Sequence, residues 1–379
     1  MREGSILFRN DAEGRETVFS RPRALLRAED EDAMLAAFEA ADRARHGGYW
    51  VAGYVSYEAG YLLDPKLRPI LPKERKGPLL CLGVFDPPEE RESSTHADPD
   101  GAVLRDARPL WSLVDYRERF ERLRAHLMAG DCYQANLTFP IFAQWEGTPL
   151  GLFDALGSRQ PVRYGAVVDL GWPVIVSRSP ELFFQVSRDG WIEALPMKGT
   201  VRRGATKEED EALREFLRND PKNQAENRMI VDLLRNDISR ISEVGTLDVP
   251  ELFHVESYPT VHQMVSRVRA RLSGAPSLKT LFSALFPCGS VTGAPKIRAM
   301  EILRDLEGCP REAYCGAIGW AAPDGSMRFS VAIRTVSLFE DGQAVYNVGG
   351  GVVLDSDAQS EYQEALLKGR FAAFDNNLG

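Results

Sequence analysis

The chain contains 379 residues with a formal net charge of −9, and 44% of its residues are hydrophobic. This length allows a large core or two domains, and the composition is typical of a globular protein. The acidic balance argues against a nucleic-acid partner, because phosphate contacts need clustered Lys and Arg. No apolar stretch is long enough for a membrane span or a signal peptide. We therefore expect a cytoplasmic protein whose partners are small molecules or other proteins.

The first hundred residues are rich in expected strands. A strand and a turn are predicted over residues 50–63, WVAGYVSYEAGYLL, and a second strand, LLCLGVF, ends at Asp86. Residues 86–102 are polar and lack apolar periodicity, so we predict an exposed linker there. We accordingly divide the chain into an N-terminal β-rich part of the fold, residues 1–100, and a second region, residues 101–379.

Helices and groups of strands alternate after the linker. An amphipathic helix is predicted to begin at Asp115 as N-cap and to end at Gly130, because apolar residues recur at helical spacing between them. Residues 164–199 predict an antiparallel meander in which VIVSRSPELFFQV is one strand and Lys198 lies at a strand end. Further helices are predicted over residues 206–219, 224–237, 295–308 and 360–374. Strands grouped in meanders with helices between the groups predict an α+β fold with antiparallel sheets.

Acidic side chains recur at helical spacing near the C-terminus. Glu361 and Glu364 are three residues apart, so they share a face of the predicted helix. Glu226 lies in an otherwise apolar segment, AENRMIVDLL. These carboxylates either point to water or hold a hard cation such as Mg²⁺, which prefers oxygen ligands.

Other segments allow a ligand or a purely structural role. The loop before Pro295 contains Gly289, Ser290, Thr292 and Gly293, and its free N–H groups suit an anion, although the spacing is not that of a P-loop. Three consecutive glycines, residues 349–351, allow a ligand to approach the backbone or form a bulge. Arg334 lies in an expected apolar strand, MRFSVAIRTVSLF, and needs an anionic ligand or a salt bridge there. His262 is either catalytic or a hydrogen-bonded core residue.

The order of motifs between residues 116 and 374 resembles the chorismate-binding enzyme family, which includes the anthranilate, aminodeoxychorismate, isochorismate and salicylate synthases. The motifs are GDCYQANL, SRSPELF, PMKGT, AENRMIVDLLRND, GSVTGAPK, YCGAIGW, AIRT, VGGG and SEYQEAL. The resemblance implies two large antiparallel β-sheets packed as a sandwich with helices on the outside.

Two residues distinguish branches of this family. Lys198 stands where anthranilate synthases carry Ala, and Gln134 stands where isochorismate and salicylate synthases place a lysine base. With GYVSYEAGYLLDPKL near the N-terminus, the chain resembles the aminodeoxychorismate synthase branch. That branch implies amination of chorismate at C4 through a covalent adduct of Lys198, with Glu181 as general acid, for para-aminobenzoate and folate biosynthesis. Alternatives are an anthranilate synthase-like activity and an inactive chorismate-binding regulatory protein.

The same resemblance assigns partners and binding residues. Ammonia is expected from a separate glutamine amidotransferase subunit or from free ammonium, because the chain has no GxCxG motif. An acid common in anthranilate synthases is replaced by Asn223. The family correspondence assigns Mg²⁺ to Glu226, Glu361 and Glu364, the enolpyruvyl carboxylate to Tyr314, Arg334, Gly349, Gly350 and Gly351, and the ring to Thr200, His262 and Thr292.

Overall fold

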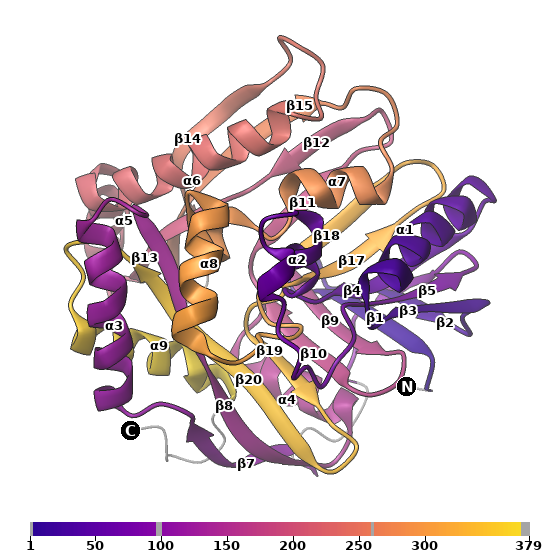
Figure 1. The fold of residues 1–379 in the computed structure, drawn as a ribbon, viewed down its shortest axis with the longest axis horizontal. Helices are drawn as coiled ribbons and strands as arrows, with labels where there is room; N and C mark the ends of the chain where they lie inside the picture. The colour runs from indigo at the N-terminus through magenta and orange to yellow at the C-terminus, as the bar shows by residue number, and fades with distance from the viewer. Residues whose placement is uncertain (1–2, 96–100, 259–260, 373–379) are drawn as a thin grey trace.

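The computed structural model, drawn in Figure 1, describes residues 3–95, 101–258 and 261–372. These residues form two ten-stranded sheets, here called sheet A and sheet B, and the strand pairs within them are antiparallel. Across sheet A the order is β16 (Gly293–Ala294), β8 (Gln134–Glu146), β20 (Gln343–Val352), β19 (Thr335–Leu338), β10 (Val174–Ser179), β9 (Tyr164–Asp169), β1 (Ser5–Asn10), β2 (Arg15–Ser20) and β6 (Glu89–Glu92), with β7 (Val103–Pro109) also paired to β8. Across sheet B it is β13 (Met197–Arg202), β15 (Val261–Arg271), β12 (Trp191–Ala194), β11 (Leu182–Val186), β18 (Met327–Val331), β17 (Ala317–Ala321), β4 (Trp50–Val55), β5 (Leu80–Phe85) and β3 (Ala24–Ala28), with β14 (Asp248–Ser257) also paired to β15.

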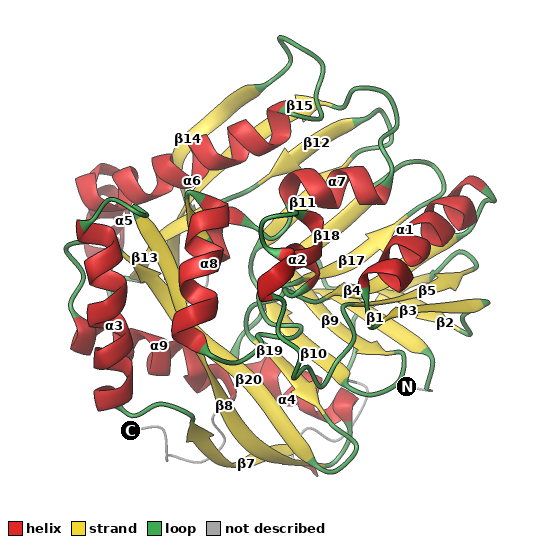
Figure 2. Cartoon of the chain, in the orientation of Figure 1, coloured by secondary structure: helices red, strands yellow, loops and turns green. Residues whose placement is uncertain are grey.

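Helices cover the outer faces of the two sheets (Figure 2). Against sheet A pack α3 (Leu113–Met128), α4 (Pro149–Arg159), α8 (Lys296–Glu307) and α9 (Ala358–Gly369). Against sheet B pack α1 (Glu31–His46), α2 (Ala59–Leu63), α6 (Pro221–Ser239) and α7 (Leu278–Leu285), while α5 (Lys207–Asn219) packs on β14 and β15. A third cluster joins the inner faces through residues such as Ile6 and Ile175 of sheet A and Tyr54 and Ile318 of sheet B. The predicted sandwich of antiparallel sheets with outer helices is therefore confirmed.

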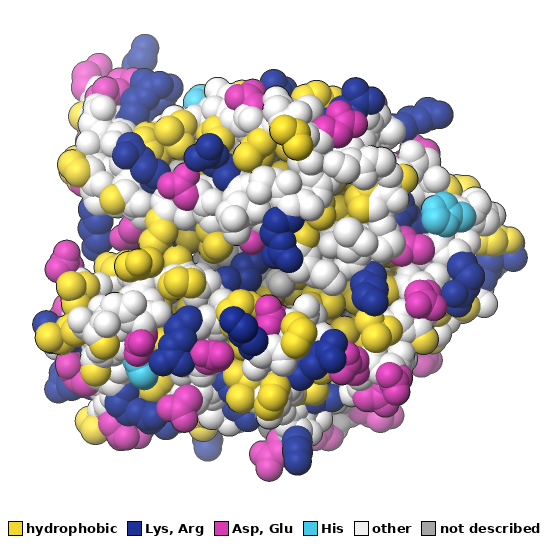
Figure 3. All heavy atoms as spheres, turned by 45° about the horizontal axis from the view of Figure 1, so that its top comes forward, with side chains coloured by type: hydrophobic (Ala, Val, Ile, Leu, Met, Phe, Trp, Pro, Cys, Tyr) yellow, Lys and Arg dark blue, Asp and Glu magenta, His cyan; other side chains and the backbone are white. Residues whose placement is uncertain are grey.

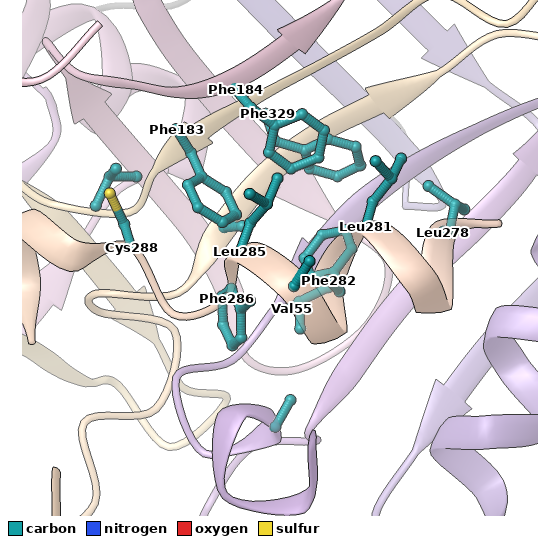
Figure 4. Packing of buried hydrophobic residues seen from close by; sticks show 14 of the residues in the cluster. Val55, Phe183, Phe184, Leu278, Leu281, Phe282, Leu285, Phe286, Cys288 and Phe329 are labelled. Atoms are coloured by element: carbon teal, nitrogen blue, oxygen red, sulfur yellow. The ribbon is translucent and has the colours of Figure 1, made fainter. Parts of the chain in front are cut away.

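The core on the outer face of sheet B is rich in aromatic side chains. Figure 4 shows Phe183 and Phe184 of β11 close to Phe282 of α7, with ring centroids 6.3 Å and 6.0 Å from that of Phe282. Phe329 of β18 lies 5.3 Å from the same ring. Such tilted and edge-on pairs add to the energy of apolar burial. This packing fixes β11 and β18, the strands that lead into the site described below.

Two segments predicted as continuous strands pass from one sheet to the other. Residues 174–186 form β10 in sheet A and then β11 in sheet B, and residues 327–338 form β18 in sheet B and then β19 in sheet A. Since β10 pairs with β19 and β11 pairs with β18, the two crossings lie side by side. Glu181 lies at the first crossing and Arg334 at the second. The prediction of one strand for each segment was wrong, because residues buried on both faces give the same apolar pattern in either sheet.

The predicted helices are present with adjusted ends. Ser112, not Asp115, is the N-cap of α3: its hydroxyl accepts a hydrogen bond from the Asp115 N–H, and the Asp115 carboxylate accepts one from the Ser112 N–H. This capping box moves the start of the helix toward the N-terminus. Gly308 ends α8 with φ 71°, as predicted. The predicted helix over 360–374 is α9 followed by a short 3₁₀ helix, Arg370–Ala372, and its last two residues lie outside the described ones.

The N-terminal residues contribute to both sheets. Strands β1, β2 and β6 belong to sheet A, and β3, β4 and β5 belong to sheet B. Strand β6 lies inside the predicted linker, residues 86–102, and residues 96–100 of that linker lie outside the described ones. No helix in the described ranges is long and apolar enough to cross a membrane. On the face drawn in Figure 3, Lys and Arg side chains are interspersed with Asp and Glu.

Candidate active site

A cavity lies where the two chain segments cross between the sheets. Its polar side chains come from elements far apart in the sequence: Glu181 and Arg334 from the two crossings, Lys198 from β13, and Lys368 from α9. Asn136 of β8, Asn347 of β20, Ser290 and Tyr314 complete the polar lining, together with the backbone of Gly349 and Gly351. The sandwich therefore gathers an amine, a carboxyl group and a guanidinium group around one hollow.

Lys198 is the second residue of β13 and is half-buried. Burial lowers the pKa of its amine below the usual value, and the neighbouring charge of Lys368 lowers it further. The charges of Glu226, Glu181 and Glu364 partly oppose this decrease in the pKa. The neutral, nucleophilic form of the amine is thus more populated near neutral pH than it is for a lysine in water.

The three glycines of β20 allow side chains to approach the strand closely. A Cβ atom at Gly351 would lie 3.3 Å from Lys198 Nζ and only 2.2 Å from Gln134 Nε2. A Cβ atom at Gly349 would lie 2.3 Å from the carbonyl oxygen of Leu137. Glycine is therefore required at both positions for the lysine amine and the neighbouring strand to lie where they do. Gln134, the first residue of the neighbouring strand β8, is buried and does not line the cavity.

Glu181 is buried, and burial raises its pKa to about 7. A hydrogen bond with Ser290 and the positive charges nearby lower this pKa in part. The backbone around Glu181 is fixed, because its N–H donates to Ser179 Oγ at 3.2 Å and its carbonyl accepts from the Val331 N–H at 3.0 Å. Its Oε1 has no hydrogen-bond partner within the described residues. A carboxyl group in this state can give a proton to a ligand in the cavity.

Arg334 is held at the second crossing rather than inside a strand. Its backbone adopts φ 52°, and its carbonyl accepts a hydrogen bond from the Arg178 N–H at 2.9 Å. Burial lowers its pKa to about 10, against the opposing influence of Glu181, so the guanidinium stays charged at neutral pH. Within the part of the chain that the structure describes it forms no ion pair. Such a cation suits an anionic ligand in the cavity.

Lys368 is a lining residue that the sequence did not single out. Its amine donates to the carbonyl of Gly349 at 3.1 Å and pairs with Glu364 at 2.8 Å. Its spacing four residues after Glu364 was the available signal, because residues at that spacing share a helix face. Asn136 and Asn347 were also missed as lining residues, since neither stands out by charge or pattern. Ser290 belongs to the loop before Pro295 that the sequence analysis considered for an anion, and it lines the cavity.

Three residues that the resemblance assigned to the ring do not line this cavity. Both ring nitrogens of the buried His262 are engaged, Nδ1 with Ser257 Oγ at 2.8 Å and Nε2 with Asp210 Oδ1 at 2.9 Å. Thr200 Oγ1 donates to Gln263 Oε1 at 2.9 Å, and Thr292 Oγ1 donates to the carbonyl of Cys288 at 3.2 Å. Lys296, after the Gly-rich loop, is paired with Asp237 at 2.7 Å.

The glutamates assigned to a metal lie beside the cavity. Glu364 is paired with Lys368, and Glu361 Oε1 accepts from Ser356 Oγ at 2.7 Å. Glu361 Oε2 would lie 3.2 Å from a Cβ atom at Gly350, so this carboxylate faces the glycine strand. Their oxygen atoms are suitable donors for Mg²⁺. Within the described ranges, however, no three His, Cys, Asp or Glu side chains come together as a metal-binding group.

Comparison with known proteins agrees with this geometry. A family model described as chorismate binding enzyme matches residues 3–373. The chain belongs to the chorismate-binding enzyme family. The resemblance inferred from its motifs is thus confirmed.

This chain covers different shares of individual members of the chorismate-binding enzyme family. Aminodeoxychorismate synthase component 1 of Klebsiella aerogenes is 44% identical over 257 residues, which are 68% of this chain and 56% of that protein. The protein of the same name from Salmonella typhimurium is 43% identical over 254 residues, 67% of this chain and 56% of that protein. Anthranilate synthase component I from Streptococcus pneumoniae superposes with a TM-score of 0.81 at 26% identity, covering 95% of this chain and 92% of that one. The chain therefore spans little more than half the length of the two aminodeoxychorismate synthases.

Proposed function

We propose that the chain acts as the first component of an aminodeoxychorismate synthase, replacing the C4 hydroxyl of chorismate by an amino group on the route to para-aminobenzoate and folate. The observation that carries this proposal is the Lys198 amine in the cavity wall, with a lowered pKa and with Glu181 nearby. Relatives named aminodeoxychorismate synthase component 1 at 43–44% identity support it.

The proposed reaction proceeds through Lys198. Its neutral amine forms a bond to C2 of chorismate, the ring double bonds shift, and the C4–O bond breaks. The departing hydroxyl takes a proton from Glu181 and leaves as water, and the proton released by the lysine nitrogen restores the acid. Ammonia then bonds to C4, the double bonds shift back, and the C2–N bond breaks as the lysine nitrogen takes the proton that the new C4 ammonium group releases. Chorismate and ammonia thus give aminodeoxychorismate and water, and the lysine amine is regenerated.

Glu181 is suited to the acid role because of its environment. With a pKa of about 7, roughly half of its population carries a proton at neutral pH, whereas an exposed glutamate carries almost none. Hydroxide is a poor leaving group, so a positioned proton donor lowers the barrier to breaking the C4–O bond.

The substrate's two carboxylates require cationic or N–H partners. We assign the enolpyruvyl carboxylate to Arg334, Tyr314 and the backbone of Gly349 and Gly351, all of which line the cavity. Lys368 adds a second positive charge on the α9 side. Ring contacts from Thr200, His262 and Thr292 stay predictions: these side chains do not line the cavity and bond to protein groups instead.

We also propose a Mg²⁺ ion at Glu361 and Glu364, with Glu226 contributing directly or through water. When bound, the ion would compensate these carboxylates and offset the ring carboxylate of the substrate. The partner that supplies ammonia is proposed to be a glutamine amidotransferase, and the name component 1 of the relatives supports a second component. The cytoplasmic location expected from the sequence stays a prediction.

Incubation of the folded chain with chorismate, Mg²⁺ and ammonium tests this function. We expect aminodeoxychorismate, identified by its mass and absorbance, and no product when ammonium is left out. Formation of anthranilate would instead support an anthranilate synthase-like activity. Unchanged chorismate that nevertheless protects the chain against thermal unfolding would support a binding protein without this activity.

A further inference from the structure

Within the described residues, part of one edge of β8 has no neighbouring strand next to the cavity. The start of β8 pairs with β16, where Gly293 is opposite Ala135, and its later part pairs with β7 from Ile141 onward. Residues 136–139 lie between these two strands. On its other edge the same stretch pairs with the glycines of β20, with Gly351 opposite Asn136.

Two buried side chains take the place of the missing strand. Glu307, at the end of α8, accepts hydrogen bonds from the Thr138 N–H at 2.9 Å and from Thr138 Oγ1 at 3.0 Å. Arg311 donates to the carbonyl of Asn136 at 2.7 Å and to the carbonyl of Val291 at 2.8 Å. The two side chains also form a bidentate pair with distances of 2.7 Å and 2.8 Å.

The N-terminal motif SYEAG holds this pair in turn. The ring of Tyr57 lies 4.4 Å from the Arg311 guanidinium carbon, a cation–π contact. Glu58 Oε1 accepts a hydrogen bond from the backbone N–H of Arg311 at 2.7 Å. Both residues are only 1% exposed, so water does not compete for these contacts. The SYEAG motif thus contacts the Glu307–Arg311 pair, which bonds to the free edge of β8.

We propose that the Glu307–Arg311 pair, supported by Tyr57 and Glu58, positions the cavity wall. Asn136 and Val291, whose carbonyl groups it binds, both line the cavity. None of the four residues lines it, so they act as positioning residues rather than catalytic ones. This inference rests on the proposed function only for its kinetic readout.

A purely stabilising role accounts less well for the geometry. The free energy needed to remove two charges from water offsets most of their mutual attraction. Proteins in which apolar residues replace a buried ion pair are therefore often as stable as the original. Here Glu307 also binds the Thr138 N–H and Arg311 also binds the Asn136 carbonyl, two backbone groups that have no strand partner on this edge within the described residues. The bonds fix where β8 and the 3₁₀ helix Gly289–Val291 lie relative to each other, which an apolar pair of the same volume does not do.

Arg311→Met and Glu307→Gln in the full chain test the proposal, with Arg45→Met as a matched control. Arg45 is also buried, pairs with Asp42 at 3.0 Å and donates to the carbonyl of Ala322 at 3.2 Å, away from the cavity. Amide hydrogen exchange at Thr138 and in residues 349–351 reports the wall directly. The KM for chorismate and kcat report its effect on the reaction.

We expect Arg311→Met to speed exchange of these amides by at least about tenfold and to raise the KM for chorismate by a similar factor. Glu307→Gln keeps an oxygen acceptor, so it should change amide exchange and the KM for chorismate less than Arg311→Met does. Arg45→Met should leave both readouts unchanged. Should Arg311→Met not fold, Arg311→Lys replaces it, because an ammonium group cannot span both carbonyls and the carboxylate.

Equal exchange in the Arg311 and Arg45 variants would overturn the proposal. If the unchanged protein does not convert chorismate, the proposed function fails, while the exchange measurement still decides the role of the pair.

Discussion

Replacing Glu181 by Gln separates the chemistry of the site from its stability. The amide keeps the shape of the side chain but cannot give a proton to a leaving hydroxyl. We expect kcat to fall by about 10²–10⁴-fold, the usual contribution of a positioned acid or base. The pKa of about 7 for Glu181, against 4.5 for an ordinary glutamate, gives the accompanying stability change. A difference of about 2.5 in pKa corresponds to roughly 3 kcal/mol of unfolding free energy.

The direction of the stability change follows from proton binding. Between pH 4.5 and 7 the folded protein holds a proton on Glu181 that the unfolded chain has released, so rising pH destabilises the fold and the loss is complete above the folded pKa. Glu181→Gln removes this loss, and the variant should be more stable than the unchanged protein by roughly 3 kcal/mol at pH 8.5 and similar to it at pH 4.5. Urea unfolding at both pH values, together with kcat at saturating chorismate, measures the two effects. A variant with kcat within twofold of the original, or with no gain in stability at high pH, would refute the reasoning.

Three further changes test other parts of the account. Gly351→Ala places a Cβ atom 2.2 Å from Gln134 Nε2 and 3.3 Å from Lys198 Nζ, so we expect kcat/KM for chorismate to fall by at least about tenfold; a fully active variant would show that this close approach is not needed. Glu58→Gln keeps the acceptor for the backbone N–H of Arg311 but removes a carboxyl group whose pKa burial raises to about 8. The decrease in unfolding free energy between pH 5 and 8 should therefore become smaller by about 3 kcal/mol. An unchanged dependence of the unfolding free energy on pH, measured by urea unfolding, would contradict the raised pKa. Phe282→Ala removes a ring in contact with Phe184 and Phe329 and should lower the unfolding free energy by about 3–5 kcal/mol, and a loss below about 1 kcal/mol would mean that this core is not packed as described.

The sequence predicted the general architecture and most elements of residues 101–379. Apolar spacing located α3, α6 and α8, because each presents one face to a sheet. The strongly charged residues 206–219 indicated α5, and a closing helix was predicted where α9 lies. Helix α1 was not predicted, although Asp30 caps it and Met34, Phe38 and Ala41 recur on its buried face. The two crossings between the sheets could not be predicted. Strand propensity depends on the local sequence, and it does not show which sheet a strand joins.

The candidate site was recovered only in part. Lys198, Glu181, Tyr314, Arg334, Gly349 and Gly351 all line one cavity. Lys368 was missed, because its spacing from Glu364 shows only that the two share a helix face, not that its amine reaches the glycine strand. His262 shows the opposite problem: its ring is fully used by Ser257 and Asp210, and no pattern along the chain distinguishes such a histidine from one that faces a substrate.

The central claim is that the Lys198 amine bonds to the substrate. Intact-protein mass spectrometry of the chain after exposure to chorismate and Mg²⁺ without ammonium tests it most directly. We predict a species heavier by one chorismate less one water, carried by Lys198 in the peptide map, which disappears when ammonium is added. Lys198→Met should form neither the adduct nor aminodeoxychorismate. Full amination activity in Lys198→Met, or an adduct on another residue, would contradict the account.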